Sequence, residues 1–142
     1  MKNVILVSHG EFAQGLMSAV LMMSGQRDDV FATSLLDGMS TETFRENFIS
    51  IIQSFTDTEG ILLFSDILSG SPFTISLDEL DKAGLLQQTM VFSGMNMPMV
   101  LTAVLVKDNL EGDLLKETIL QEAQLGITYY DPNQTFQKDE DL

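Results

Sequence analysis

Cysteine is absent from the 142-residue chain, and histidine occurs only once. Without thiols the chain cannot form disulfides, use a cysteine nucleophile or hold an iron–sulfur cluster, and one histidine leaves too few ligands for zinc. Positive charge is also scarce: seven lysines and arginines face 21 aspartates and glutamates, which gives a net charge of −14. Such a chain repels nucleic acid and anionic membranes, and its charge favours a basic protein partner.

Long apolar runs are missing as well. None approaches the roughly 20 residues of a membrane helix, and the apolar stretch before Ser8 is shorter than the core of a signal peptide. We therefore expect a cytoplasmic protein. The apolar fraction of 44% still allows a folded core, and the length suits one domain. We place this domain at residues 1–131 and an acidic tail at residues 132–142.

Short apolar runs alternate with segments whose apolar residues recur at helical spacing. The runs predict strands at residues 4–7, 30–36, 61–64, 88–92 and 127–130. The periodic segments predict helices that include residues 12–23, 44–55, 72–80, 99–106 and 113–124. This alternation predicts an α/β fold, a doubly wound and mostly parallel sheet with helices on both faces. We expect the strand order 2-1-3-4, with a short last strand that is antiparallel to the others.

Two polar residues follow strands that would be neighbours in this sheet. Ligands of open parallel sheets bind beyond the C-terminal ends of the strands, where the strand order reverses. His9 follows the first predicted strand and Asp66 the third, so both are expected to face one crevice. A histidine suits proton or phosphoryl transfer, and an aspartate bonded to one ring nitrogen would leave the other as a nucleophile. A loop-capping histidine and a turn-forming aspartate are the structural alternatives.

The stretch Ser69-Gly70-Ser71-Pro72-Phe73 opens the third predicted helix. Free N–H groups at a helix start bind anions, and a phosphoryl group on His9 would need such donors because no lysine or arginine lies nearby in sequence. An ordinary helix cap is the alternative. The glycine-rich loops of dinucleotide-binding and P-loop proteins are absent. We therefore expect neither a cofactor nor a metal ion.

Three motifs, taken in order, resemble the IIA component of the mannose-type bacterial sugar phosphotransferase system. The first is a strand, His-Gly and a helix, in ILVSHGEFAQGLMSAVLMMSGQRDDV. The second is DILSGSPF, in which Ser69 stands where the family has the first of two glycines. The third is SGMNMPMVL, after the fourth predicted strand. Together they extend over nearly the whole chain.

The resemblance implies a phosphocarrier. In this family the carrier HPr would phosphorylate His9 on Nε2, with Asp66 holding Nδ1 and Ser71, beside Gly70 and Ser69, binding the phosphoryl oxygens. The IIB component would then take the phosphoryl group, and the membrane components IIC and IID would couple its transfer to sugar uptake. The resemblance also implies a homodimer in which the last strand, Ile127–Tyr130, is exchanged between subunits.

Three other functions are open to the same residues. The phosphotransferase subunit of dihydroxyacetone kinases has a histidine after its first strand, but usually as His-Ser, whereas Gly10 follows His9 here. A serine hydrolase using Ser71, His9 and Asp66 would lack the G-x-S-x-G elbow. A regulatory domain of the same fold would not need phosphorylation. The sequence does not name a sugar.

Overall fold

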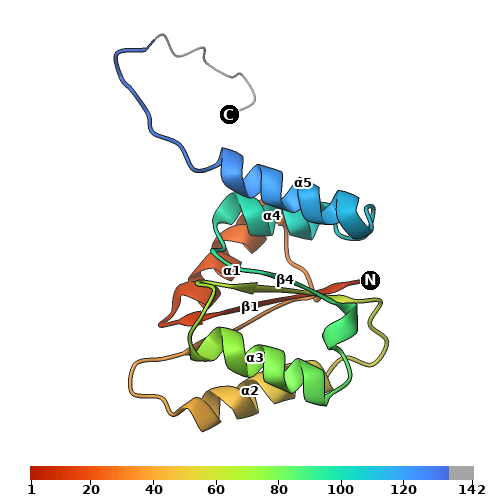
Figure 1. Cartoon of the computed structure of the whole chain (residues 1–142). Coiled ribbons are helices and arrows are strands. Elements are labelled where there is room, and N and C mark those ends of the chain that lie inside the picture. Colours follow the sequence, from red (N-terminus) through yellow and green to blue (C-terminus); the bar gives the residue numbers. More distant parts are fainter. Residues whose placement is uncertain (135–142) are drawn as a thin grey trace.

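A parallel sheet between two layers of helices is the centre of the structure (Figure 1). The structure is a computed structural model and describes residues 1–134. In chain order, the elements of this part are β1 (Asn3–His9), α1 (Phe12–Ser24), β2 (Val30–Leu35), α2 (Thr41–Gln53), β3 (Ile61–Ser65), α3 (Ser71–Lys82), a 3₁₀ turn (Leu86–Gln88), β4 (Thr89–Phe92), α4 (Met97–Val106) and α5 (Gly112–Leu125).

The strand order in the sheet is β2-β1-β3-β4, as predicted. All three pairings are parallel, which requires the helical crossovers that the sequence supplies. The central strands β1 and β3 carry unbroken apolar runs because both of their faces are covered. The order reverses between β1 and β3, so their C-terminal ends lie side by side at one edge of the sheet.

Successive residues of a strand point to opposite faces, and this divides the core into two clusters. Val4 and Leu6 of β1 pack with buried residues of α1, α4 and α5. Ile5 and Val7 pack instead with α2 and α3, on the other side of the sheet. Figure 1 shows the same two layers, with α1, α4 and α5 above the sheet and α2 and α3 below it.

Two boundaries at the candidate site differ slightly from the prediction. His9 is the last residue of β1 instead of lying just beyond the predicted strand at residues 4–7, because the pairing with β2 extends to Leu35. Ser71 is the first residue of α3 and Pro72 the second, instead of Pro72 being the first. Both shifts stay within one residue or two, since strand and helix ends depend on local hydrogen bonds.

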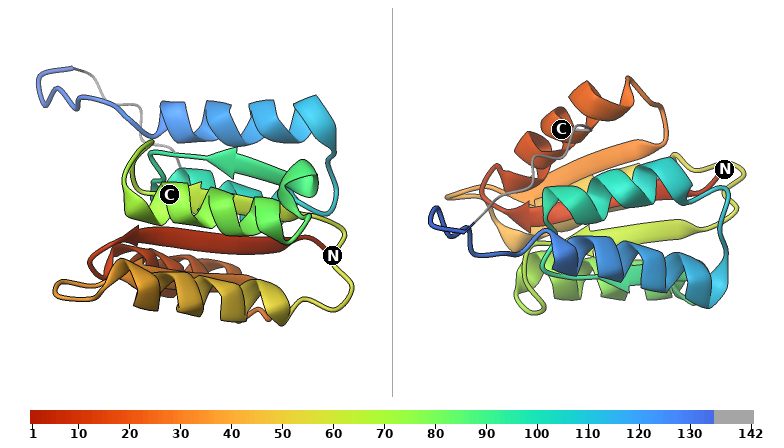
Figure 2. Two further views of the ribbon diagram at one scale, coloured as in Figure 1. Left: turned by 60° about the horizontal axis from the view of Figure 1, so that its bottom comes forward. Right: turned by 90° about the horizontal axis from the view of Figure 1, so that it is seen from above.

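The predicted last strand, residues 127–130, is not formed within the single chain. A strand needs a neighbouring backbone, and this segment leaves the end of α5 with Ile127, Tyr129 and Tyr130 exposed. It departs on the side of the molecule where the strand arrowheads end (Figure 2). The exchange of this strand between subunits therefore stays a prediction. Most of the predicted acidic tail, residues 135–142, lies outside the described residues.

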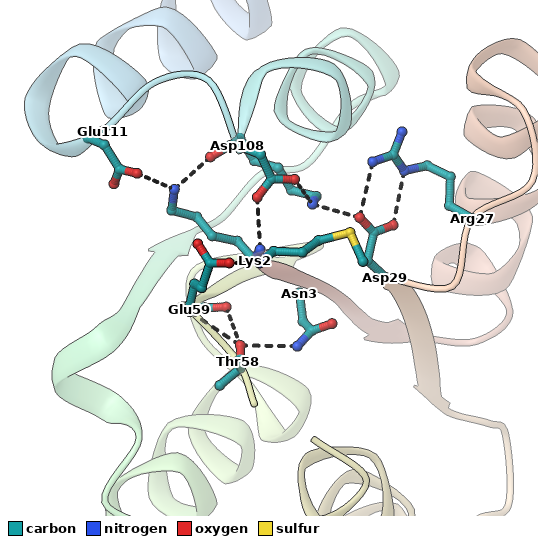
Figure 3. A network of polar contacts seen from close by, with 11 residues as sticks. Lys2, Asn3, Arg27, Asp29, Thr58, Glu59, Asp108 and Glu111 are labelled. Carbon is teal, nitrogen blue, oxygen red and sulfur yellow. Dashed lines mark hydrogen bonds and ion pairs between the residues drawn. The ribbon is translucent and has the colours of Figure 1, made fainter. Parts of the chain in front are cut away.

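A network of charged side chains ties the opposite end of the sheet together (Figure 3). Lys107 is fully buried, and its Nζ lies 2.6 Å from Asp29 Oδ2 and 2.6 Å from Asp108 Oδ2. Arg27 bonds both carboxylate oxygens of Asp29, at 2.9 and 3.0 Å. Lys2 donates to the Lys107 carbonyl oxygen at 2.7 Å. These contacts join the start of β1 to β2 and to the loop between α4 and α5.

The pKa of Asp29 reflects this network. Burial raises the pKa of the carboxyl group, but the hydrogen bonds from Arg27 and Lys107 and the attraction of their charges outweigh burial and lower it to about 2. The carboxylate is therefore the favoured form, although the residue is only 2% exposed. A buried carboxylate is stable only while such partners stay in place.

Candidate functional site

His9 and Asp66 meet at the C-terminal ends of β1 and β3. One carboxylate oxygen of Asp66, Oδ2, lies 2.8 Å from His9 Nδ1 and also accepts the backbone N–H of His9 at 2.9 Å. The other oxygen, Oδ1, accepts the backbone N–H of Ile67 at 2.9 Å. The carboxylate is thus fixed at both oxygens, and it fixes both the backbone and the ring of the histidine.

The environment keeps Asp66 charged. Partial burial raises the pKa of its carboxyl group, but the hydrogen bonds from the His9 backbone, the His9 ring and the Ile67 backbone lower it below its ordinary value. A carboxylate can only accept at Nδ1, so that nitrogen carries the proton and Nε2 keeps its lone pair. The His9 side chain is 46% exposed, and that of Asp66 is 15% exposed. The ring of His9 is therefore accessible while its partner is sheltered.

Gly70 lies against the Nε2 edge of the ring. A Cβ atom added at this position would be 3.0 Å from His9 Cε1 and 3.3 Å from Nε2. The φ angle of Gly70 is +97°, a conformation that disfavours other residues as well. Gly70 is also the residue before α3, so the N–H groups that begin this helix start beside Nε2. No side chain caps α3, and its first N–H groups have no partner within the helix.

The two serines of the predicted site are placed differently from Asp66 and Gly70. Ser71 is the first residue of α3 and is partly buried, whereas Ser69 is exposed in the preceding loop. Within residues 1–134, no hydrogen bond joins either hydroxyl group to His9. The structure therefore places Asp66 and Gly70 next to His9, and within residues 1–134 it forms no hydrogen bond between either serine hydroxyl and the ring.

Apolar and acidic side chains surround the histidine. Phe12, Leu36, Ile67 and Leu68, all next to the C-terminal ends of the three strands β1, β2 and β3, are exposed; we call these four residues the apolar rim. Each of the six lysines and arginines in residues 1–134 is ion-paired with a carboxylate, and none lies in these loops. The same residues contain no cluster of three potential metal ligands, and none of their helices is long and apolar enough to cross a membrane.

Comparison with known proteins assigns the family. The family model described as "PTS system fructose IIA component" matches residues 3–120, which is most of the chain and includes every candidate site residue. The chain belongs to this family. It is a IIA component of the mannose and fructose branch of the sugar phosphotransferase system (PTS).

Relatives and solved structures agree with this assignment. The IIA chain is 26% identical over 107 residues to the "PTS system mannose-specific EIIAB component" of Escherichia coli K12, which covers 75% of this chain and 32% of that protein. It thus spans about a third of that relative. A phosphotransferase system component EIIA from Streptococcus agalactiae has a TM-score of 0.78 and 28% identity, with 91% and 97% of the two chains covered. The mannose/sorbose specific IIA subunit from Enterococcus faecalis shares the fold, with a TM-score of 0.79, 22% identity and coverage of 96% and 100%.

The sequence left one part of this IIA site unnoticed. Ser8, directly before the histidine, is fully buried, and its Oγ accepts the backbone N–H of Ala13 at 2.7 Å. The hydroxyl oxygen of Ser34, its neighbour on β2, lies 3.2 Å from the hydroxyl oxygen of Ser8. A serine that ends an otherwise apolar run in a central strand is the signal that could have drawn attention to it.

Proposed function

We propose that this chain is a phosphocarrier that accepts a phosphoryl group from phosphorylated HPr on His9 and passes it to the IIB component. The observation that carries the proposal is the pairing of His9 Nδ1 with Asp66 at 2.8 Å, because it directs the free lone pair of Nε2 outward. HPr and IIB are the proteins with which IIA components of this system typically work. We further propose that the chain acts in the cytoplasm, upstream of membrane components IIC and IID.

The chemical step follows from the protonation of the ring. The Nε2 lone pair attacks phosphorus, the N–P bond of the donor's phosphohistidine breaks, and the electron pair of that bond returns to the donor's nitrogen. Because Nδ1 keeps its proton, the phosphorylated ring of His9 is cationic, and the Asp66 carboxylate stabilises it. One phosphohistidine replaces another, so positioning and charge stabilisation are the main requirements for catalysis.

The α3 N-terminus would hold the phosphoryl oxygens. A group on Nε2 would lie next to Gly70, where the absence of a side chain leaves room for it, and in front of the helix's free N–H groups. The Ser71 hydroxyl is close enough in sequence to join them by rotation of its side chain, and Ser69 is a weaker candidate because it is exposed in the loop. We propose no metal ion or cofactor for this transfer.

The surroundings of the site suit docking of a basic protein. The apolar rim offers contact area around His9, while Glu11 and Asp37 provide exposed carboxylates beside it. With a net charge of −14, the chain would attract a basic carrier over long distances. We also propose a homodimer built by strand exchange, since the outer edge of β4 is unpaired within residues 1–134 and residues 127–130 are available to pair with a partner.

Intact mass spectrometry tests the proposal. The chain is incubated with phosphoenolpyruvate, enzyme I and HPr, in parallel with a His9→Ala variant whose folding is checked by circular dichroism. We expect the gain of one acid-labile phosphoryl group in the wild type alone. Adding IIB should remove it. No gain in folded wild-type protein would refute the proposal, and transfer to a dihydroxyacetone kinase subunit instead of IIB would assign the chain to that system.

A further inference from the structure

A closed set of buried hydrogen bonds lies on the far side of β1 from the ring of His9. Strand alternation sends His9 toward α3 and the preceding residue, Ser8, toward α1. Ser8 Oγ accepts the Ala13 N–H at 2.7 Å and lies 3.2 Å from Ser34 Oγ. Ser34 in turn donates to Oε1 of Gln14. Because the single proton of Ser34 is used there, the Ser8 hydroxyl donates to Ser34.

These bonds connect three elements around the histidine. They run from α1 to β1, from β1 to β2, and from β2 back to α1. Both serines, Ser8 and Ser34, are buried. The N-cap residue of α1, Glu11, makes no side-chain cap bond, so Ser8 caps the helix in its place from five residues upstream of Ala13. The bond between Ser8 and Ala13 closes a short loop that contains His9.

The remaining backbone contacts of this loop are also fixed. The N–H of Gly10 donates to the Leu35 carbonyl oxygen at 2.9 Å, and the N–H of His9 donates to Asp66 at 2.9 Å. Gly10 itself has a φ angle of +58°, which allows the chain to turn sharply from β1 into α1. The histidine therefore stands between two anchors, Asp66 on the side of β3 and Ser8 on the side of α1.

We infer that Ser8 is a positioning residue for phosphoryl transfer: its hydroxyl group holds the turn between β1 and α1, and thereby keeps Nε2 of His9 aimed at the incoming phosphorus. The inference rests on the proposed role of His9 as phosphoryl acceptor. Ser8 does not contact the ring and acts only through the backbone. Displacing a reacting atom by about 1 Å can lower a rate by about 100-fold, so loss of this hydroxyl group should be visible in the rate.

Single-turnover phosphorylation by phosphorylated HPr tests this inference. For Ser8→Ala we expect a limiting rate lower by about 10- to 100-fold and an unchanged half-saturating HPr concentration, because the docking surface is intact. Ser34→Ala is the matched control, since it removes a buried hydroxyl group but leaves the bond between Ser8 and Ala13. Its limiting rate should stay within about threefold of the wild type.

A second pair of variants distinguishes the effect of losing the hydroxyl group from an effect on folding. The side chains of Ser8→Thr and Ser8→Val have nearly the same shape, but only threonine can accept the Ala13 N–H. We therefore expect Ser8→Thr to keep nearly the wild-type limiting rate and Ser8→Val to have a lowered one. Equal rates for the two would overturn the inference, as would a rate for Ser8→Ala equal to that of Ser34→Ala.

Ring spectra of His9 give a readout that does not depend on transfer. In ¹⁵N-labelled protein we expect exchange broadening of the ring resonances in Ser8→Val but not in Ser8→Thr. If the wild type takes up no phosphoryl group, the proposed function fails, and these spectra alone judge whether Ser8 positions the ring. Identical, sharp ring signals in both variants would overturn that role.

Discussion

Removing the buried ammonium group of Lys107 should cost the fold a large part of its stability. The change Lys107→Met keeps the length of the side chain and, within residues 1–134, leaves Asp29 with Arg27 as its one remaining charged partner. Breaking a buried ion pair from one side costs about 3–5 kcal/mol, and we expect about 3 kcal/mol because the contacts of Arg27 at 2.9 and 3.0 Å persist. A domain has only about 5–15 kcal/mol of stability in total.

Urea unfolding at pH 7, followed by circular dichroism, measures this loss as a lower midpoint with an unchanged slope. Lys116→Met is the matched control, because Lys116 is about half exposed and its ion pair with Asp113 is on the surface; we expect a change within about 0.5 kcal/mol. The double variant Lys107→Met/Asp29→Asn should lose at least about 1 kcal/mol less than the sum of the single variants. A loss below about 1 kcal/mol for Lys107→Met would refute the reasoning.

The same network predicts how stability depends on pH. The pKa of Asp29 falls from 3.8 to about 2 on folding, which corresponds to about 2–3 kcal/mol at about 1.4 kcal/mol per pKa unit. Because the folded-state pKa is the lower one, this stability is present above about pH 4 and is lost as the pH falls toward 2. The variant Asp29→Asn should lack that part of the acid dependence. If its stability falls with pH in parallel with the wild type, the carboxylate does not contribute as argued.

Three further predictions concern the candidate site. Asp66→Asn should lower the phosphorylation rate by about 100-fold or more, as for loss of a carboxylate that orients a histidine. Ring ¹⁵N shifts of His9 should show that Nδ1 is no longer the main protonated nitrogen, and unchanged shifts would contradict this prediction. Gly70→Ala should lower the phosphorylation rate at least about tenfold, because its Cβ would press on the ring of His9. Gly84→Ala is the control: its φ angle is also positive, but nothing lies within 4 Å of the added Cβ, so it should lose only about 1 kcal/mol of stability. Equal phosphorylation rates for the two variants would show that contact with the ring is unimportant. Leu68→Glu should raise the half-saturating HPr concentration about tenfold without changing the limiting rate, while Leu114→Glu, exposed on α5, should change neither; a lower limiting rate for Leu68→Glu would argue against a docking role.

The sequence predicted the sheet and the meeting of His9 with Asp66 for the same reason. Apolar runs alternating with helical periods leave few topologies, and in the order 2-1-3-4 the ends of strands 1 and 3 must be neighbours. Gly70 was also singled out, since a glycine before a helix start is visible in the sequence. Its contact with the ring was not visible, because that depends on the exact turn of the loop that follows β3.

Long-range polar contacts were beyond the reach of the sequence. Lys2, Asp29 and Lys107 are far apart along the chain, and no local period marks a buried lysine or aspartate. The sequence does not mark Ser8 as a site residue, because its partners belong to two other elements. Residues 127–130 have the composition of a strand, but whether they form one depends on a neighbouring backbone that the chain itself does not place beside them.

The alternation of side chains along β1 has a consequence for insertions and deletions. β1 is paired on both sides, with β2 and with β3, so its register is held by two ladders at once. Shifting the strand by one residue would move each side chain to the opposite face. After the loss of one residue, the histidine would take the place of Ser8 and be buried under α1, and Gly10 would take the place beside Asp66. Losing a single residue between Asn3 and Val7 should therefore be more harmful than most substitutions of the same residues, because it exchanges the two faces of the strand at once.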